Sequence, residues 1–180
     1  IRMSSGDLIV TTDADCRLGK RWLETLVAFY EEHKPKMVVA PVSYHNETSM
    51  FEKMQTEEFL SLIAITGGAI RMGHPIMCNG ANLAYEKAAF KAAGGFGSTR
   101  FSSGDDVFLM LRIRKLFGSN AIRFLKHREA IVHTEARKKL SDFLQQRTRW
   151  ASKNKGYEFN ILGVSFTVYM VNLLILTGMV

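Results

Sequence analysis

The final segment of the chain, residues 159–180, constrains the fold more than any other part of the sequence. It contains no charged residue, only apolar side chains with a few Asn, Ser, Thr and Gly. A helix needs about 20 such residues to cross the hydrocarbon core of a bilayer. We therefore predict a transmembrane helix here. The alternative is a buried core helix at the end of a soluble protein.

The positive charge of the chain is concentrated just before this segment. The formal net charge is +7, from 24 Lys and Arg against 17 Asp and Glu. Residues 137–158 hold seven of the basic residues and two of the acidic ones, so most of the excess lies there. Basic residues beside a transmembrane helix favour the cytoplasmic side. We expect residues 1–158 to face the cytoplasm at the inner (cell) membrane, with no nucleic-acid partner.

The composition describes one globular domain or a little more. The 180 residues are 47% hydrophobic and 23% charged, with 3 Pro, which excludes intrinsic disorder and collagen-like repeats. The two cysteines have no CxxC-type spacing, and a cytoplasmic domain keeps thiols reduced, so a disulfide scaffold is excluded as well. Residues 1–6 are typical of a loop that leads into a central strand. We expect the first strand–helix units of the domain to precede them.

Strand-like and helix-like segments alternate along residues 1–158. Short apolar runs predict strands at 7–12, 37–42, 122–125 and 130–134. Apolar residues at helical spacing predict helices at 19–33, 48–65, 105–117 and 141–155, and a short Ala-rich helix before Gly94-Gly95. The Gly67-Gly68 pair marks the end of the second helix or a break in it. Such alternation predicts an α/β fold with a largely parallel sheet.

Two acidic motifs are candidates for chemistry. Asp13-Ala14-Asp15 follows the first predicted strand, and two carboxylates there could hold a hard divalent cation on a diphosphate. The alternative is a solvated turn. Gly104-Asp105-Asp106 begins a predicted helix, where a carboxylate could act as a general base. The alternative is an ordinary helix N-cap with an acidic first turn.

A third motif, Gln146-Arg147-Thr148-Arg149-Trp150, precedes the uncharged segment. An Arg offers a planar fork for phosphate, and a Trp offers a flat apolar face for a sugar or for the membrane interface. The alternative is a basic juxtamembrane helix with an interfacial Trp.

In this order and at these separations, the three motifs resemble the membrane-integrated family-2 glycosyltransferases of the GT-A fold. That family includes the cellulose, chitin and hyaluronan synthases and enzymes that glycosylate lipids. The resemblance spans nearly the whole chain and extends to Cys78-Asn79-Gly80-Ala81-Asn82 and Gly94-Gly95-Phe96. It implies three parts. These are a partial GT-A (Rossmann-like) catalytic domain at 1–136 without its N-terminal nucleotide-binding units, a basic amphipathic interface helix at 137–158, and the transmembrane helix at 159–180.

The resemblance also implies roles for the acidic residues. Asp13 and Asp15 match the motif that holds Mg²⁺ or Mn²⁺ on the donor diphosphate, with Asp15 favoured as the direct ligand. Asp106 matches the catalytic base, and Asp105 stands where Glu is commoner. His133 resembles a histidine that completes the metal site in many GT-A enzymes.

The third motif matches the family's QxxRW. Gln146, Arg149 and Trp150 would then help to hold the diphosphate and the acceptor. The implied reaction is an inverting transfer from a nucleotide diphosphate-sugar, a UDP-sugar by resemblance, to a glycan or lipid acceptor at the membrane. The donor sugar is not readable, because the residues that recognise the nucleoside in this family would precede Ile1.

Two other functions remain open at this point. A haloacid-dehalogenase-like phosphohydrolase also has Asp-x-Asp after its first strand and a later GDDxxD, with the first Asp as nucleophile. In this sequence Leu109 stands at the position of the final acid. Cys16 stands after the first motif, where such enzymes usually have Thr or Val. The other possibility is a non-catalytic, membrane-anchored fragment.

Overall fold

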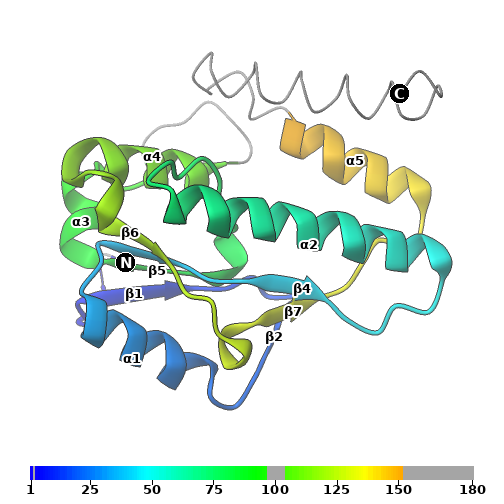
Figure 1. Cartoon of the computed structure of the whole chain (residues 1–180), viewed down its shortest axis with the longest axis horizontal. Helices are drawn as coiled ribbons and strands as arrows, with labels where there is room; N and C mark the ends of the chain where they lie inside the picture. The colour runs from blue at the N-terminus through cyan, green and yellow to red at the C-terminus, as the bar shows by residue number, and fades with distance from the viewer. Residues whose placement is uncertain (2, 97–103, 152–180) are drawn as a thin grey trace.

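The computed structural model describes residues 1, 3–96 and 104–151, which form two β-sheets and the helices packed around them (Figure 1). The strands are β1 (Leu8–Thr11), β2 (Arg17–Leu18), β3 (Met37–Val39), β4 (Val42–Tyr44), β5 (Leu83–Glu86), β6 (Ile122–Phe124) and β7 (Val132–Thr134). The α-helices are α1 (Trp22–His33), α2 (Met50–Arg71), α3 (Lys87–Ala92), α4 (Asp105–Phe117) and α5 (Leu140–Ala151). Short 3₁₀ helices lie at Gly80–Asn82, Ser119–Ala121 and Arg128–Ala130.

The predicted transmembrane helix, residues 159–180, lies outside the described residues, as does the end of the predicted helix 141–155. Within the ranges that the structure describes, no helix combines the length and the apolar character needed to cross a bilayer.

The first sheet is mixed, with the strand order β1-β5-β3-β6. Strand β5 is antiparallel to both of its neighbours, β1 and β3, whereas β3 and β6 are parallel. The prediction of a largely parallel sheet is therefore only partly correct. Strands β1, β3 and β6 share a direction, but β5 separates β1 from β3. Alternation along the sequence does not reveal such an insertion, because it does not determine the order of strands in space.

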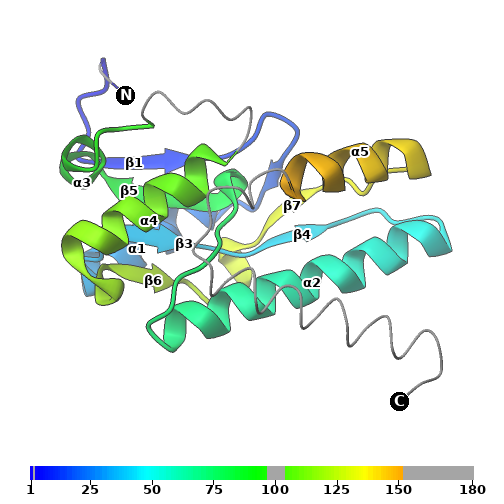
Figure 2. The same cartoon turned by 90° about the horizontal axis from the view of Figure 1, so that it is seen from above.

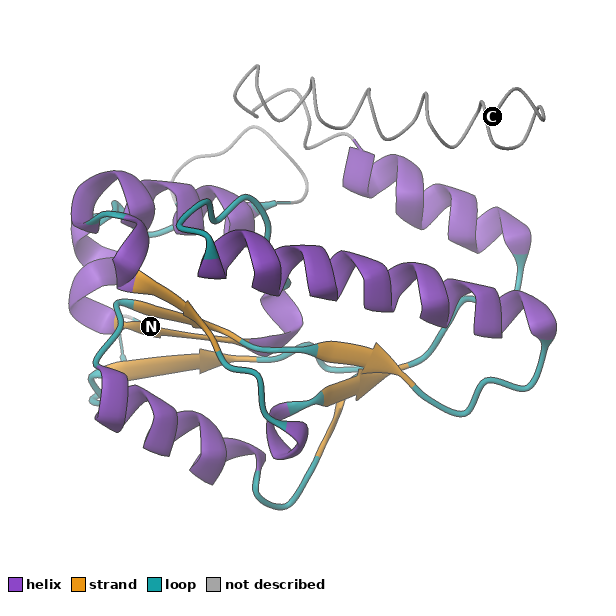
Figure 3. Cartoon of the chain, viewed as in Figure 1, coloured by secondary structure: helices purple, strands orange, loops and turns teal. Residues whose placement is uncertain are grey.

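Helices cover both faces of the first sheet (Figure 3). Strand β3 is buried on both sides, and its successive side chains point to opposite faces. Val38 packs with Leu26 of α1, while Met37 and Val39 pack with Ile113 and other residues of α4. This three-layer arrangement confirms the predicted α/β class.

The single strand predicted at residues 37–42 is in fact two strands in different sheets. Pro41 lies between β3 and β4, and it has no N–H to continue a ladder. Its carbonyl instead accepts hydrogen bonds from Val132 N (3.1 Å) and from Asn82 Nδ2 (2.7 Å). The chain thus passes into the second sheet, whose strand order is β2-β7-β4.

Helix α2 is longer than the sequence pattern predicts. It begins after a capping box, in which Glu52 N donates to Ser49 Oγ and the Glu52 carboxylate accepts from Ser49 N. It then runs through Gly67 and Gly68 to Arg71, so the predicted end or break at the glycine pair is wrong. The absent side chain of Gly67 makes room for a close approach, since a Cβ there would lie 3.0 Å from ring atoms of Phe124.

Candidate active site

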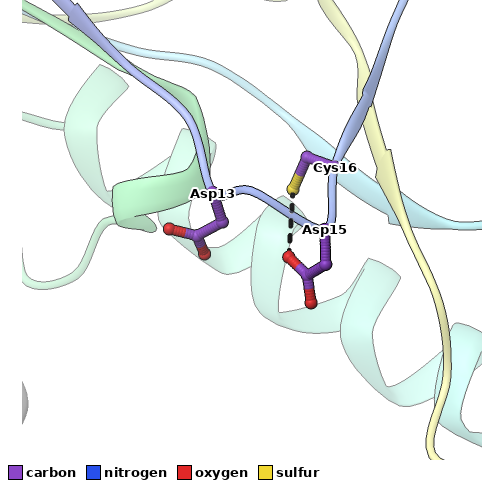
Figure 4. Close-up of side chains that lie close together, drawn as sticks. All are labelled: Asp13, Asp15 and Cys16. Carbon is purple, nitrogen blue, oxygen red and sulfur yellow. Dashed lines mark hydrogen bonds between the residues drawn. The ribbon is translucent and has the colours of Figure 1, made fainter.

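The loop after β1 carries the first acidic motif. Thr11, the last residue of the strand, donates its hydroxyl to the carbonyl of Gly80 at 2.9 Å. Cys16 N donates to the carbonyl of Asp13 at 3.1 Å, which closes the turn. The carboxylates of Asp13 and Asp15 project from the same side of this loop in Figure 4. They and the Cys16 thiol each offer a ligand atom, and these atoms lie within 4.8 Å of one another.

The two carboxylates fit a hard divalent cation better than the thiol does. Mg²⁺ and Mn²⁺ prefer oxygen ligands and use few protein carboxylates beside substrate phosphates. Burial raises the pKa of the Cys16 thiol above its ordinary value, so the sulfur stays protonated at neutral pH. The thiol lies 3.9 Å from Asp15 Oδ1 and donates weakly to it (Figure 4). Asp13 and Asp15 are therefore the residues that could hold the cation.

The second acidic motif is fixed at the start of α4. Gly104 precedes the helix with a φ of 109°, a conformation that favours glycine. Asp106 Oδ2 accepts from Gly80 N at 2.9 Å, and Oδ1 accepts from Val107 N at 2.8 Å. These two bonds orient the Asp106 carboxylate toward the segment that also binds Thr11.

The third motif lies on α5, which packs against α2 on the same side of β4 and β7 (Figures 1 and 2). The ring centroids of Phe143 and Phe51 are 5.6 Å apart, and those of Trp150 and Phe59 are 6.1 Å apart. The linker before α5 is also anchored to α2. Gln55, only 2% exposed, donates to the carbonyl of Arg137 at 2.8 Å and accepts from its N–H at 3.0 Å.

The structure brings the residues of all three motifs to one cavity of about 620 Å³. The predicted residues that line it are Asp13, Asp15, Asp105, Asp106, Gln146, Arg149 and Trp150. They come from three regions far apart in the sequence, the loop after β1, the start of α4 and the C-terminal half of α5. The structure places these residues around one cavity, while their roles in the site stay predictions.

The pKa of Asp13 is affected by charged residues of all three motifs. Burial raises the pKa of Asp13 above its ordinary value, and the neighbouring carboxylates of Asp15 and Asp106 raise it further. The Arg149 guanidinium acts in the opposite direction and lowers it. Two acidic motifs and the Arg of the third therefore share one electrostatic environment, in which a cation or a protonated acid is favoured near Asp13.

The structure places His133 outside the acidic cluster. Among the described residues, the cluster contains only Asp13, Asp15 and Cys16. His133 lies on β7 opposite Arg17 of β2, and its ring centroid is 6.1 Å from that of His45. Its Nδ1 is buried and has no hydrogen-bond partner within the described part of the chain. Its role as a metal ligand stays a prediction.

Sequence reasoning missed several residues of the cavity wall. Tyr44, at the end of β4, and Glu135 and Arg137, just after β7, also line it. Strands β4 and β7 are parallel, so their carboxyl ends meet at the same edge. The strand predicted at 130–134 pointed to Glu135 and Arg137 as edge residues, but nothing in the sequence paired that edge with Tyr44.

Two of three comparisons with known proteins return a match. A family model described as glycosyl transferase family group 2 matches residues 8–179. A similar solved structure is the crystal structure of glucosyl-3-phosphoglycerate synthase from Mycobacterium tuberculosis in complex with phosphoglyceric acid. That match has 16% identity and a TM-score of 0.42, and it covers 78% of this chain. The chain spans 45% of the length of that synthase. A search of curated proteins finds no match.

Proposed function

Because this chain belongs to the glycosyl transferase family group 2, and is thus an enzyme of the glycosyltransferase type, we propose that it transfers a sugar from a nucleotide diphosphate-sugar to an acceptor hydroxyl. The observation that carries the proposal is that one cavity collects the three motifs, and that Asp13 interacts electrostatically with Asp15, Asp106 and Arg149 there. The donor is proposed to be a UDP-sugar and the acceptor a glycan or a lipid.

In the proposed reaction, Asp106 accepts the proton of the acceptor hydroxyl. The acceptor oxygen then forms a bond to the anomeric carbon as the bond from that carbon to the diphosphate oxygen breaks. Attack from the face opposite the leaving group inverts the anomeric configuration. The hydrogen bonds from Gly80 N and Val107 N hold the Asp106 carboxylate in place for this proton transfer.

The leaving diphosphate is stabilised by positive charge. Asp13 and Asp15 would hold Mg²⁺ or Mn²⁺, which when bound neutralises the charge that develops on the diphosphate. Arg149 offers its planar guanidinium to the same group. Trp150 also lines the cavity and is proposed to contact the acceptor.

The haloacid-dehalogenase-like alternative is disfavoured by α4. Its final metal-binding acid would occupy the position of Leu109, whose side chain is fully buried in the core formed by α4 and the first sheet. Leucine has no ligand atom for a metal, so the final acid of that motif is missing here.

We also propose that the enzyme works at the inner membrane with its catalytic part facing the cytoplasm. The uncharged residues 159–180 and the basic residues before them support this location. Fractionation of cells followed by alkaline carbonate extraction tests it, and release of the protein into the soluble fraction would contradict it.

The experiment on function compares the whole chain with its Asp106→Asn variant, using a panel of UDP- and GDP-sugars and membrane or glycan acceptors. Loss of the base should lower the transfer rate by about 10²- to 10⁴-fold while the fold is retained. Asp7→Asn, an exposed residue outside the cavity, is the matched control and should keep the normal rate. Full activity of the Asp106 variant would reject the base assignment, and no transfer by the unaltered chain from any donor would reject the function.

A further inference from the structure

We propose that Arg147, one of the unspecified positions of the QxxRW motif, is a positioning residue that fixes α5 on α2 so that Gln146 and Arg149 face the cavity. The inference rests on the proposed function, since it concerns how that site is assembled. Arg147 itself does not line the cavity.

The first observation is an ion pair between α5 and α2. Arg147 Nε donates to Glu58 Oε1 at 3.1 Å, and an Nη of the same guanidinium donates to Glu58 Oε2. Two parallel bonds from a planar fork define direction as well as distance. The Arg147 side chain is 18% exposed and that of Glu58 44%, so solvent screens this pair less than an ordinary surface pair.

The second observation is that the same guanidinium lies over two rings of α5. Its central carbon is 4.5 Å from the centroid of Phe143 and 4.3 Å from that of Trp150. Trp150 also lies against Phe59 of α2. The indole therefore contacts both a cation on its own helix and an aromatic ring on the neighbouring one.

Helix geometry connects these contacts to the cavity. Successive residues are about 100° apart around an α-helix, so Phe143, Arg147 and Trp150 share the face toward α2. Gln146 and Arg149 lie on the adjacent face, which lines the cavity. A rotation of α5 that separated Arg147 from Glu58 would turn Gln146 and Arg149 with it. The direction of the substrate-binding side chains thus depends on this pair.

The segment before α5 is attached to α2 at a second place. Gln55 ties the chain before α5 to α2 through the backbone of Arg137, which anchors the N-terminal end of the helix. The contacts of Arg147 and Trp150 anchor it further along. Without Arg147, α5 would remain attached at Arg137 but its C-terminal half would lose an ion pair and a stacking partner.

The test measures transfer kinetics and the environment of Trp150 in the whole chain. Arg147→Gln should lower kcat/KM for the acceptor by about 10-fold or more, because small misplacements of binding groups are costly. Arg147→Lys should be intermediate, since an ammonium keeps the charge but not the fork or the stack. The double variant Arg147→Glu with Glu58→Arg should recover part of the activity that either single change loses.

Quenching of Trp150 fluorescence distinguishes a change in the position of α5 from a loss of folded protein. Acrylamide quenching of Trp150, assigned by comparison with Trp150→Phe, should increase in Arg147→Gln while the unfolding midpoint changes little. The control is Arg21→Gln, which breaks an exposed Arg–Glu pair at 3.4 Å on α1 and should alter neither readout.

Two results would overturn the inference. One is unchanged quenching together with unchanged kcat/KM in Arg147→Gln. The other is a fall in kcat that matches the loss of folded protein while KM and quenching stay constant. If the unaltered chain transferred no sugar, the proposed function would fail by itself, and the quenching of Trp150 would still decide whether Arg147 holds α5.

Discussion

The carboxylate of Asp13 lies among groups of like charge. Burial raises the pKa of Asp13 most, the charges of Asp15 and Asp106 raise it further, and Arg149 has the smallest effect, which lowers it. Close carboxylates of this kind favour the binding of a cation, since a divalent ion relieves their repulsion and gains oxygen ligands at the same time. The acidic cluster is therefore suited to a bound divalent cation.

Replacing Asp15 with Ala should remove the metal dependence of nucleotide binding. In isothermal titration with UDP, the unaltered chain should bind more tightly with Mn²⁺ than without it. The variant should lose at least about 10-fold of that gain, because even residues that merely support metal ligands are worth 10- to 100-fold in affinity. Asp7→Ala serves as the matched control, and a metal effect that persisted in Asp15→Ala would contradict the assignment.

At the scale of the helix, α2 shows how tertiary contacts override a local signal. Glycine in a helix interior costs about 1 kcal/mol relative to alanine, so two in succession favour a break. The helix continues because residues on both sides of the glycine pair pack against other elements. Phe59 packs under α5, Ile70 lies in the core, and Gly67 lets the ring of Phe124 approach.

The two glycines should therefore respond differently to alanine. Gly68 has no atom within 4 Å of a built Cβ, so Gly68→Ala should stabilise the protein by up to about 1 kcal/mol. At Gly67 the new Cβ would meet the Phe124 ring at 3.0 Å, so the gain should be cancelled or reversed. Urea denaturation of both variants measures this, and equal stabilisation would show that the contact with Phe124 is unimportant.

At the scale of the molecule, Asn82 connects the two sheets. It is completely buried, and its side chain accepts from Trp22 Nε1 at 3.0 Å. Its Nδ2 donates to Pro41 O at 2.7 Å and to Ala130 O at 2.8 Å. Trp22 lies on α1, Pro41 lies between β3 and β4 where the chain changes sheet, and Ala130 lies just before β7. The cavity draws residues from both sheets, so its shape depends on this junction.

Truncation of Asn82 should destabilise the whole fold. In Asn82→Ala the Trp22 indole N–H and the Ala130 carbonyl lose this partner, at about 1–3 kcal/mol for each group left unsatisfied, while Pro41 O keeps the hydrogen bond from Val132 N. We expect a lower urea midpoint and a loss of about 2 kcal/mol or more. The exposed Asn120→Ala should stay within about 0.5 kcal/mol of the unaltered protein. A similarly small effect at Asn82 would mean that water replaces its contacts.

The sequence by itself predicted the candidate residues of the site and determined most of the elements. Strand β1 and helix α4 follow from apolar periodicity, and Asp13, Asp15, Asp106 and Arg149 are recognisable because ligand and acid–base character belong to the residue type. Their order along the chain predicted that they act together.

Tertiary structure decided how these pieces meet. The antiparallel β5, the change of sheet at Pro41 and the continuation of α2 through Gly67 all depend on contacts between distant segments. The pairing of Arg147 with Glu58, 89 residues apart, is invisible in any local pattern. Such contacts depend on strand order and helix rotation, which are set by the packing of the whole core and not by any one stretch of sequence.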